Sequence, residues 1–294
     1  TSTPTLTMPR TQQSLIGSNA HASSASTNDT SGARMNTARS APAGITFSLT
    51  IYFSASATVS SRPQGPTPFG PQSALAEAIR RIGVAIKLDR TDDTRARVVM
   101  VTSSVPSEGK STLSSLLAKS AAARGERVIL VDCDLRSPSF AVAAGGRDLS
   151  EQPPKDLIDV LSEEAPFDQA VCADKRFECD LLYPSKGTPL AGDLINRASF
   201  PALVEELKLH YDLIVLDAPP AVAVSDSVTI GRLSDVVVYA VRWGFAARST
   251  VLRGIKELEA AGAPLHGLVF TLVDNIRAAQ LRDFAERFCP PEEK

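Results

Sequence analysis

The sequence predicts an α/β protein built on a doubly wound, mostly parallel sheet. Two observations support this prediction: short, continuous apolar runs of the kind that form buried parallel strands recur along the chain, and helical stretches separate them. The runs occupy residues 97–103, 127–134, 212–219, 235–242 and 266–274. Alternating strands and helices imply right-handed crossovers, so we expect helices on both faces of one sheet.

The amino-terminal part of the chain has a different composition. Residues 1–62 contain 24 Ser or Thr, four Arg and one Asp, and neither Lys nor Glu. Such a segment buries too little apolar surface to order itself, so we expect a disordered tail or linker over residues 1–70; an organelle transit peptide has a similar composition. A folded domain over residues 71–289 and a short tail over residues 290–294 complete the expected organisation.

Charge and cysteine content exclude several classes of protein. The chain has 31 Lys and Arg against 33 Asp and Glu, a net charge of -2, which gives no sign of a nucleic-acid partner. Its four cysteines form no CxxC pair and fit neither a disulfide framework nor a zinc site, so a reducing cytosol is the natural setting. The uncharged segment 40–61 has nine Ser or Thr among 22 residues and is too polar for a membrane span. We therefore expect a cytoplasmic protein.

An amphipathic helix is expected ahead of the first strand, over residues 73–88. Leu75, Ile79, Ile82 and Ile86 recur there at helical spacing, directly after a Pro- and Gly-rich stretch. The apolar residues would place one face of this helix on the domain.

A phosphate-binding motif follows the first strand. Residues 104–112 read SVPSEGKST, which is GxxxxGK[ST] with Ser in the first glycine position, and a helical stretch comes next. In such a loop the backbone N–H groups and the helix N-terminus surround phosphates, a lysine neutralises them and the next hydroxyl binds Mg²⁺. The predicted nucleotide-binding residues are Ser104, Val105, Pro106, Ser107, Glu108, Gly109, Lys110, Ser111 and Thr112. The motif and its context predict a P-loop NTPase fold.

Acidic residues end two further strands. Asp132 and Asp134 follow the second apolar run and Asp217 ends the third. Ligands bind outside the carboxyl ends of parallel strands, so these carboxylates should converge on the phosphate loop, where Mg²⁺ takes one or two protein oxygens. Each Asp considered alone could instead be a helix cap or a turn residue, Asp134 above all.

Three segments resemble the Walker A, A′ and B motifs of the bacterial tyrosine kinases (BY-kinases), which serve capsule and exopolysaccharide synthesis and export. They read VTSSVPSEGKST, VILVDCDLRSP and YDLIVLDAPP, and the resemblance spans residues 72–275. It implies a protein-tyrosine kinase, with ATPase activity, that uses ATP and Mg²⁺.

The resemblance also implies roles for single residues. Lys110, Asp132 and Asp134 would be catalytic, and Ser111, Asp132 and Asp217 would hold the metal, Asp217 directly or through water. Asp134 is the candidate to accept the proton of the attacking tyrosine hydroxyl, although either Asp of the second motif could belong wholly to the metal shell. Arg136 of that motif joins the nucleotide-binding residues.

Partners follow from the same resemblance. BY-kinases carry ExxRxxR on the helix ahead of the phosphate loop and assemble through it; here Glu77 and Arg80 match, while the third position is Gly83. A homo-oligomer through Glu77 and Arg80 is expected, the alternative being an exposed ion pair within one helix. Protein tyrosines would be the substrates. A membrane-embedded polysaccharide co-polymerase would be the activator and could bring the chain to the inner face of the membrane, as could a missing upstream segment.

The chain also departs from the kinase pattern. Its last tyrosine is Tyr239, so the usual carboxyl-terminal tyrosine cluster is absent from the sequence. Tyr183, Tyr211 and Tyr239 are expected to pack in or beside strands, which leaves Tyr52 as the accessible candidate acceptor. Thr271 stands where the relatives commonly have an Asn linked to the purine base.

Two rival interpretations remain open. One is a nucleotide-switched regulatory ATPase of the Min/Par class, although Val105 occupies the position of the extra lysine that marks those proteins. The other is a degenerate family member that binds ATP and assembles without phosphorylating tyrosine.

Overall fold

The computed structural model describes residues 73–88, 96–140, 155–174 and 178–273. All of them belong to a compact unit formed by Pro42–Lys294, while a second unit, Thr1–Ala41, lies wholly outside the described residues. The expected tail over residues 1–70, the expected short tail over 290–294, segment 40–61 and Tyr52 also lie outside them.

One sheet forms the centre of the described part. Its seven strands have the order β3-β4-β2-β5-β1-β6-β7, and all neighbours are parallel except β3 and β4. The strands are β1 (Arg97–Ser103), β2 (Val128–Asp132), β3 (Cys172–Asp174), β4 (Cys179–Leu182), β5 (Leu213–Asp217), β6 (Val236–Arg242) and β7 (Leu265–Thr271). The predicted mostly parallel sheet is confirmed.

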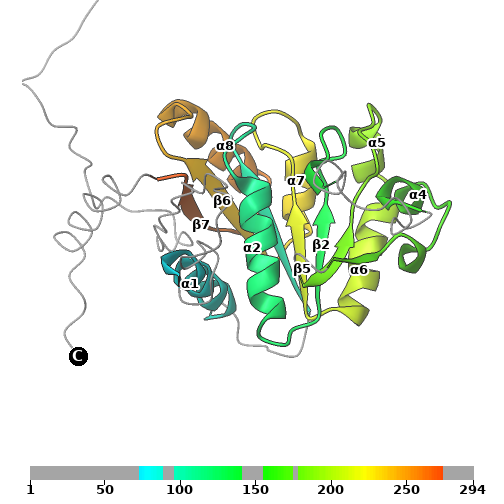
Figure 1. The fold of residues 1–294 in the computed structure, drawn as a ribbon. Helices are drawn as coiled ribbons and strands as arrows, with labels where there is room; N and C mark the ends of the chain where they lie inside the picture. Colours follow the sequence, from blue (N-terminus) through cyan, green and yellow to red (C-terminus); the bar gives the residue numbers. More distant parts are fainter. Residues whose placement is uncertain (1–72, 89–95, 141–154, 175–177, 274–294) are drawn as a thin grey trace, which may run out of the picture. The chain divides into compact units, whose positions relative to one another are not determined.

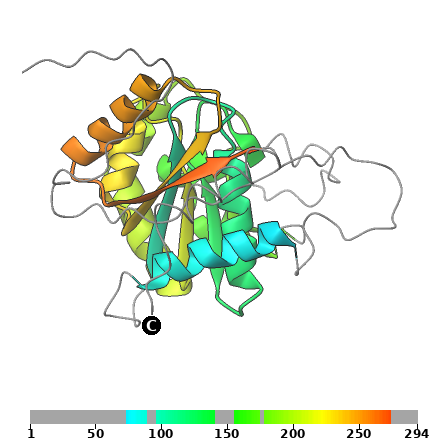
Figure 2. The same ribbon diagram turned by 90° about the vertical axis from the view of Figure 1, so that its left-hand side faces the viewer.

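Helices cover both faces of the sheet. They are α1 (Ala74–Leu88), α2 (Lys110–Ala122), α4 (Leu157–Leu161), α5 (Ala191–Ile195), α6 (Ser199–His210), α7 (Asp226–Arg232) and α8 (Arg248–Ala260), with a 3₁₀ turn at Phe167–Gln169. Figures 1 and 2 show α1 and α2 against one face, where Ile82 and Leu117 pack with Val99 and Val101 of β1. The doubly wound architecture is therefore also confirmed.

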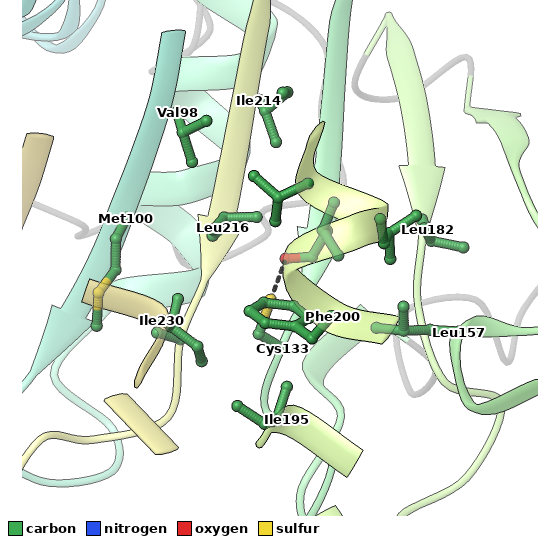
Figure 3. Packing of buried hydrophobic residues seen from close by; sticks show 14 of the residues in the cluster. Val98, Met100, Cys133, Leu157, Leu182, Ile195, Phe200, Ile214, Leu216 and Ile230 are labelled. Atoms are coloured by element: carbon green, nitrogen blue, oxygen red, sulfur yellow. Dashed lines mark hydrogen bonds between the residues drawn. The ribbon is translucent and has the colours of Figure 1, made fainter. Parts of the chain in front are cut away.

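The second core lies on the opposite face, beneath helices α4 to α8. Phe200 of α6 and Ile230 of α7 pack there with Met100 and Leu216 from the two central strands, and Figure 3 shows these side chains interlocking. Phe200 is completely buried, so its truncation to Ala would cost about 3–5 kcal/mol. This packing fixes the central strands whose ends carry the candidate site.

The observed elements begin and end close to the predicted ones. The helix predicted over 73–88 begins at Ala74, and the strand predicted over 97–103 has those bounds. The strands β2 and β5 end at Asp132 and Asp217, two residues earlier than predicted. In the described parts of the chain, no helix has the length and apolar character that a membrane crossing requires.

Candidate active site

The loop between β1 and α2 turns through two residues with left-handed backbone conformation. Ser107 has φ 65° and Gly109 has φ 84°, and a Cβ on Gly109 would lie 3.4 Å from the Thr271 side chain of β7. Only glycine adopts this φ without strain, so Gly109 fits both the turn and the close approach. The motif glycine is thus explained by backbone geometry.

Helix α2 starts at Lys110 and aims its first backbone N–H groups into the loop. The first helical hydrogen bond at this end runs from Leu113 N to Gly109 O, at 2.9 Å. The N–H groups of the residues before Leu113 therefore lack intrahelical acceptors, and they carry the partial positive charge of the helix end. Pro106, Ser107 and Thr112 are exposed around this end, whereas Ser104 is buried. The arrangement suits an anion such as a phosphate.

Lys110 reaches two of the predicted carboxylates. Its Nζ lies 3.2 Å from Asp134 Oδ2 and 3.6 Å from Asp217 Oδ2, and the lysine is only 6% exposed. Burial disfavours the ammonium, but the charges of Asp217, Asp134 and Asp132 outweigh it and raise the pKa of Lys110. The lysine stays charged at neutral pH, next to the loop that would receive phosphates.

Asp217 ends the central strand β5 and is completely buried. Its Oδ1 accepts a hydrogen bond from Ser114 Oγ at 3.0 Å. Its Oδ2 is buried and has no hydrogen-bond partner among the described residues, apart from the ionic contact with Lys110. Burial raises the pKa of this carboxyl. This buried oxygen faces the Lys110 ammonium, and a carboxylate oxygen in such a position is suited to a cation.

The donors around Asp217 fit Mg²⁺. No group of three His, Cys, Asp or Glu residues within the described ranges forms a metal centre, but Mg²⁺ typically takes one or two protein oxygens and completes its shell with water and phosphates. Asp217 and the Ser111 hydroxyl at the start of α2 are oxygens of the required type. Ser111 Oγ here donates to Ser139 Oγ at 2.9 Å.

Asp132 is the register partner of Asp217 across β2 and β5, but its carboxylate bonds to backbone. Oδ2 accepts from Ser139 N at 2.8 Å and from Phe140 N at 3.1 Å, while Oδ1 accepts from Asp134 N at 3.1 Å. Burial, together with the charge of Asp217, raises the pKa of Asp132 to about 7. In this arrangement Asp132 shapes the loop that carries Asp134.

Asp134 retains a carboxylate oxygen directed at the site. Its Oδ1 accepts from Ser137 N at 3.2 Å, and its Oδ2 faces Lys110. The residue is 7% exposed, more than Asp132 or Asp217, which are both completely buried. Of the three carboxylates, Asp134 is the one with access to the surface.

The Arg136 side chain, predicted to bind nucleotide, points away from the phosphate loop. Its guanidinium pairs with the buried Asp226 of α7, and a Cβ on Gly192 would come within 3.2 Å of the same guanidinium. In the described part of the chain this ion pair joins the second motif to α7, next to α5, rather than to the phosphate loop.

Glu77 and Arg80 form an ion pair on α1. The Arg80 Nη2 to Glu77 Oε2 distance is 2.6 Å and both side chains are about half exposed, while Arg81 Nε also lies 3.2 Å from Glu77 Oε1. At Gly83 a Cβ would lie 3.5 Å from the Arg124 guanidinium, so a cation occupies the neighbourhood of the missing third motif residue.

The tyrosines and Thr271 are packed inside. Tyr183, Tyr211 and Tyr239 are 6%, 8% and 0% exposed, which confirms their expected packing. Thr271 is 3% exposed and its Oγ1 donates to Glu108 O at 2.5 Å, so its hydroxyl supports the phosphate loop.

The sequence did not single out several residues that complete the site. Ser114 stands one helical turn after Lys110 and reaches Asp217; that spacing on a predicted helix was the available signal. Ser139 and Asp226 contact Ser111 and Arg136 from positions whose sequence gives no such signal.

The chain is similar in sequence to a known domain family and to several bacterial proteins. A family described as an AAA domain matches residues 96–261, more than half of the chain. The chain is 29% identical over 199 residues to tyrosine-protein kinase YwqD of Bacillus subtilis (strain 168), covering 68% of this chain and 81% of that protein. It is 26% identical over 202 residues to tyrosine-protein kinase etk of Escherichia coli (strain K12), covering 68% and 27%. It is 24% identical over 224 residues to the succinoglycan biosynthesis transport protein ExoP of Rhizobium meliloti (strain 1021), covering 74% of this chain and 28% of that protein. The chain thus spans little more than a quarter of the two longer relatives.

Several solved structures have a similar fold. The kinase domain of E. coli tyrosine kinase ETK has a TM-score of 0.66 at 21% identity, covering 76% of this chain and 89% of that one. The kinase domain of VpsO has a TM-score of 0.59 at 28% identity, covering 68% and 96%. MinD from Pyrococcus horikoshii OT3, complexed with Mg-ADP, shares the fold at a TM-score of 0.50 and 19% identity, covering 60% and 70%. The chain therefore belongs to the AAA domain family, with a P-loop ATPase scaffold of the type found in bacterial tyrosine kinases.

Proposed function

We propose that the chain is an ATP-dependent protein-tyrosine kinase of the bacterial P-loop type. The observation that carries the proposal is the placement of Lys110 Nζ between Asp134 and Asp217, at the start of a helix whose first N–H groups point into the loop. Phosphoryl transfer asks the protein mainly for positioning and charge neutralisation, which a lysine, a helix N-terminus and Mg²⁺ supply together.

Each site residue has a proposed part in the reaction. Lys110 would leave the two carboxylates and neutralise the transferred phosphate, while Ser111 and Asp217 would hold Mg²⁺, with Asp132 supporting the metal side of the site through the loop it shapes. Asp134, released from Lys110 by the incoming nucleotide, would orient the tyrosine hydroxyl and accept its proton. Mg²⁺, when bound, supplies charge neutralisation at the phosphates.

The biological setting is proposed from the relatives. One of them is a succinoglycan biosynthesis transport protein and others are tyrosine-protein kinases. We assign the chain to the regulation of capsular or exopolysaccharide synthesis or export, with ATP and Mg²⁺ as cofactors. Its partners would be protein tyrosine substrates, a membrane-embedded co-polymerase and further copies of the chain held through Glu77 and Arg80.

A switch ATPase that phosphorylates nothing is the second candidate. Two observations favour it: Tyr183, Tyr211 and Tyr239 are all buried, and MinD shares the fold. Val105 argues against the Min/Par class, whose members carry a lysine at that position of the loop.

The deciding experiment is incubation of the chain with Mg²⁺ and ATP, followed by mass spectrometry for phosphotyrosine and by measurement of released phosphate. Lys110→Ala is the test variant and Lys119→Ala, an exposed lysine on the same helix, is the matched control. Phosphotyrosine on the chain or on an added tyrosine polymer, abolished only by Lys110→Ala, supports the kinase. Lys110-dependent ATP hydrolysis without phosphotyrosine, in the presence of a candidate co-polymerase, supports the switch ATPase.

A further inference from the structure

Glu108 places a buried carboxylate inside the phosphate loop. The residue is completely buried. Its Oε2 accepts hydrogen bonds from Ser104 N at 2.7 Å and Val105 N at 2.9 Å, and its Oε1 accepts from Arg242 N at 3.3 Å. The two oxygens therefore tie the start of the loop to the end of β6.

A negative charge in an anion-binding loop needs a physical reason. A buried carboxylate is costly unless hydrogen bonds stabilise it, and three backbone N–H groups do so here. Because Glu108 occupies the N–H groups of Ser104 and Val105, phosphates are left to the N–H groups at the start of α2. Both carboxylate oxygens are engaged and buried, so Glu108 is not available as a general base or a metal ligand.

The backbone around Glu108 is held from three sides. Glu108 stands between the two residues with left-handed conformation, Ser107 and Gly109. Its carbonyl oxygen accepts from the Thr271 hydroxyl at 2.5 Å, and the Ser107 carbonyl accepts from the Arg242 guanidinium at 3.4 Å. A non-glycine residue keeps a left-handed conformation only where its surroundings fix it. The Glu108 side chain supplies that constraint from within the loop.

We infer that Glu108 is a positioning residue that holds the phosphate loop in its nucleotide-receiving shape before the nucleotide binds. The inference rests on the proposed nucleotide site and gives Glu108, one of the predicted nucleotide-binding residues, a role that does not require it to touch the phosphates. Its physical content is preorganisation: a loop already wound into its bound shape loses less conformational freedom on binding, so the affinity is higher.

The test compares Mg·ADP binding by calorimetry, at a temperature well below unfolding, for wild type, Glu108→Ala and Glu108→Gln. Glu205→Gln, a change at a mostly exposed glutamate on α6, is the control. Glu108→Ala should weaken binding at least tenfold. Glu108→Gln keeps one acceptor oxygen for Ser104 and Val105 and should recover most of the loss. The control should bind as wild type.

Hydrogen exchange in the absence of nucleotide gives a second measurement. Peptides covering residues 103–108 should exchange faster in Glu108→Ala, because the N–H groups of Ser104 and Val105 lose their acceptor, and close to the wild-type rate in Glu108→Gln, which keeps one acceptor oxygen for them. If Glu108→Ala does not fold, Glu108→Asp, whose shorter side chain withdraws that oxygen, takes its place in both measurements. A purely structural role would lower the unfolding midpoint and leave the affinity of the folded protein unchanged. Binding within twofold of wild type by folded Glu108→Ala, or by Glu108→Asp where the Ala variant does not fold, overturns the inference alone. Failure of wild type to bind Mg·ADP overturns the proposed function as well.

Discussion

Ser114 donates a hydrogen bond to Asp217 across 103 positions of sequence, with Oγ 3.0 Å from Oδ1. The same hydroxyl also lies 3.0 Å from Lys110 O. It joins α2 to the end of β5 inside the site and leaves the other Asp217 oxygen for a cation.

Replacing Ser114 with Ala should therefore weaken Mg²⁺-dependent nucleotide binding about three- to tenfold and cost about 1–2 kcal/mol of stability, because a buried carboxylate oxygen loses its donor. The Ser114 bond lowers the pKa of Asp217, so its removal raises that pKa further. Mg²⁺ titrations at fixed ADP and urea unfolding measure the two effects. Ser115→Ala is the matched control, since that hydroxyl is exposed and bonds to Thr112 O; equal behaviour of the two variants would contradict the prediction.

Gly109 and Gly125 provide a matched pair with nearly equal backbone conformation, φ 84° and 85°. Alanine at either position should cost about 1 kcal/mol or more from the left-handed conformation. Only Gly109→Ala should also weaken nucleotide binding, because its Cβ meets Thr271, whereas nothing lies within 4 Å of a Cβ on Gly125. Urea midpoints and ADP affinities of the two variants check this; an equal loss of affinity would show that the loop contact is unimportant.

Stability should depend on pH through Asp132. Its folded pKa of about 7 exceeds the ordinary value of 3.8, so the folded protein binds more protons than the unfolded chain between these limits. The contribution of Asp132 is therefore fully present below about pH 4 and is lost as the pH rises through 7. The raised pKa of Asp217 acts in the same direction.

Urea unfolding of the nucleotide-free chain at pH 5 and pH 8 measures this dependence. Wild type should lose stability between the two values, and Asp132→Asn should lose less, because its side chain does not titrate. A steeper loss in the Asn variant is the contrary result.

The Tyr239 hydroxyl packs against Gly254 and leaves no room there for a side chain. A Cβ on Gly254 would lie 2.2 Å from the Tyr239 hydroxyl, which donates to Ser104 Oγ at 3.1 Å. Gly254→Ala should destabilise the protein by about 2–3 kcal/mol despite the better helix propensity of Ala. Tyr239→Phe removes the clashing oxygen, so the double variant should recover most of that loss. Thermal unfolding of the two single variants and the double variant measures the recovery, and additive losses would refute the fit.

Glu77 and Arg80 should matter for assembly. Changing both to Ala is expected to lower the oligomer mass measured by light scattering, because they are the two matching positions of the assembly motif. The control is the same double change at Arg253 and Glu257, an exposed ion pair on α8. An unchanged mass in the Glu77 and Arg80 variant would leave their contact as an ordinary surface ion pair, worth about 0.3–0.5 kcal/mol.

The sequence predicted the parts of the fold whose pattern is local. Long apolar runs and the phosphate motif located the central strands and α2, because burial on both faces leaves an uninterrupted apolar sequence. The hairpin of β3 and β4 has strands of three and four residues, too short for any periodicity, and it was not predicted as a pair. The detailed position of each strand end also depended on tertiary contacts.

For the site, too, the sequence predicted the residues but not their contacts. Residue types and spacing identified the lysine and the acidic residues, whereas their hydrogen bonds depend on how distant segments meet. The bonds from Asp132 to Ser139 and Phe140, seven and eight positions later, and the pairing of Arg136 with Asp226 arise from loop paths that no local pattern encodes.

The position of β1 and β5 within the sheet has a consequence for how the molecule opens. Both strands are flanked by neighbours on each side, with β2 next to β5, and these three strands deliver the phosphate loop and the carboxylates. Opening fluctuations that begin at β3 can therefore release that margin of the sheet while the charged cluster stays assembled. Amide protons of the three inner strands should be the last to exchange. Opening at β7, by contrast, would withdraw Thr271 from the phosphate loop, so the two margins of the sheet are not equivalent for the chemistry at the centre.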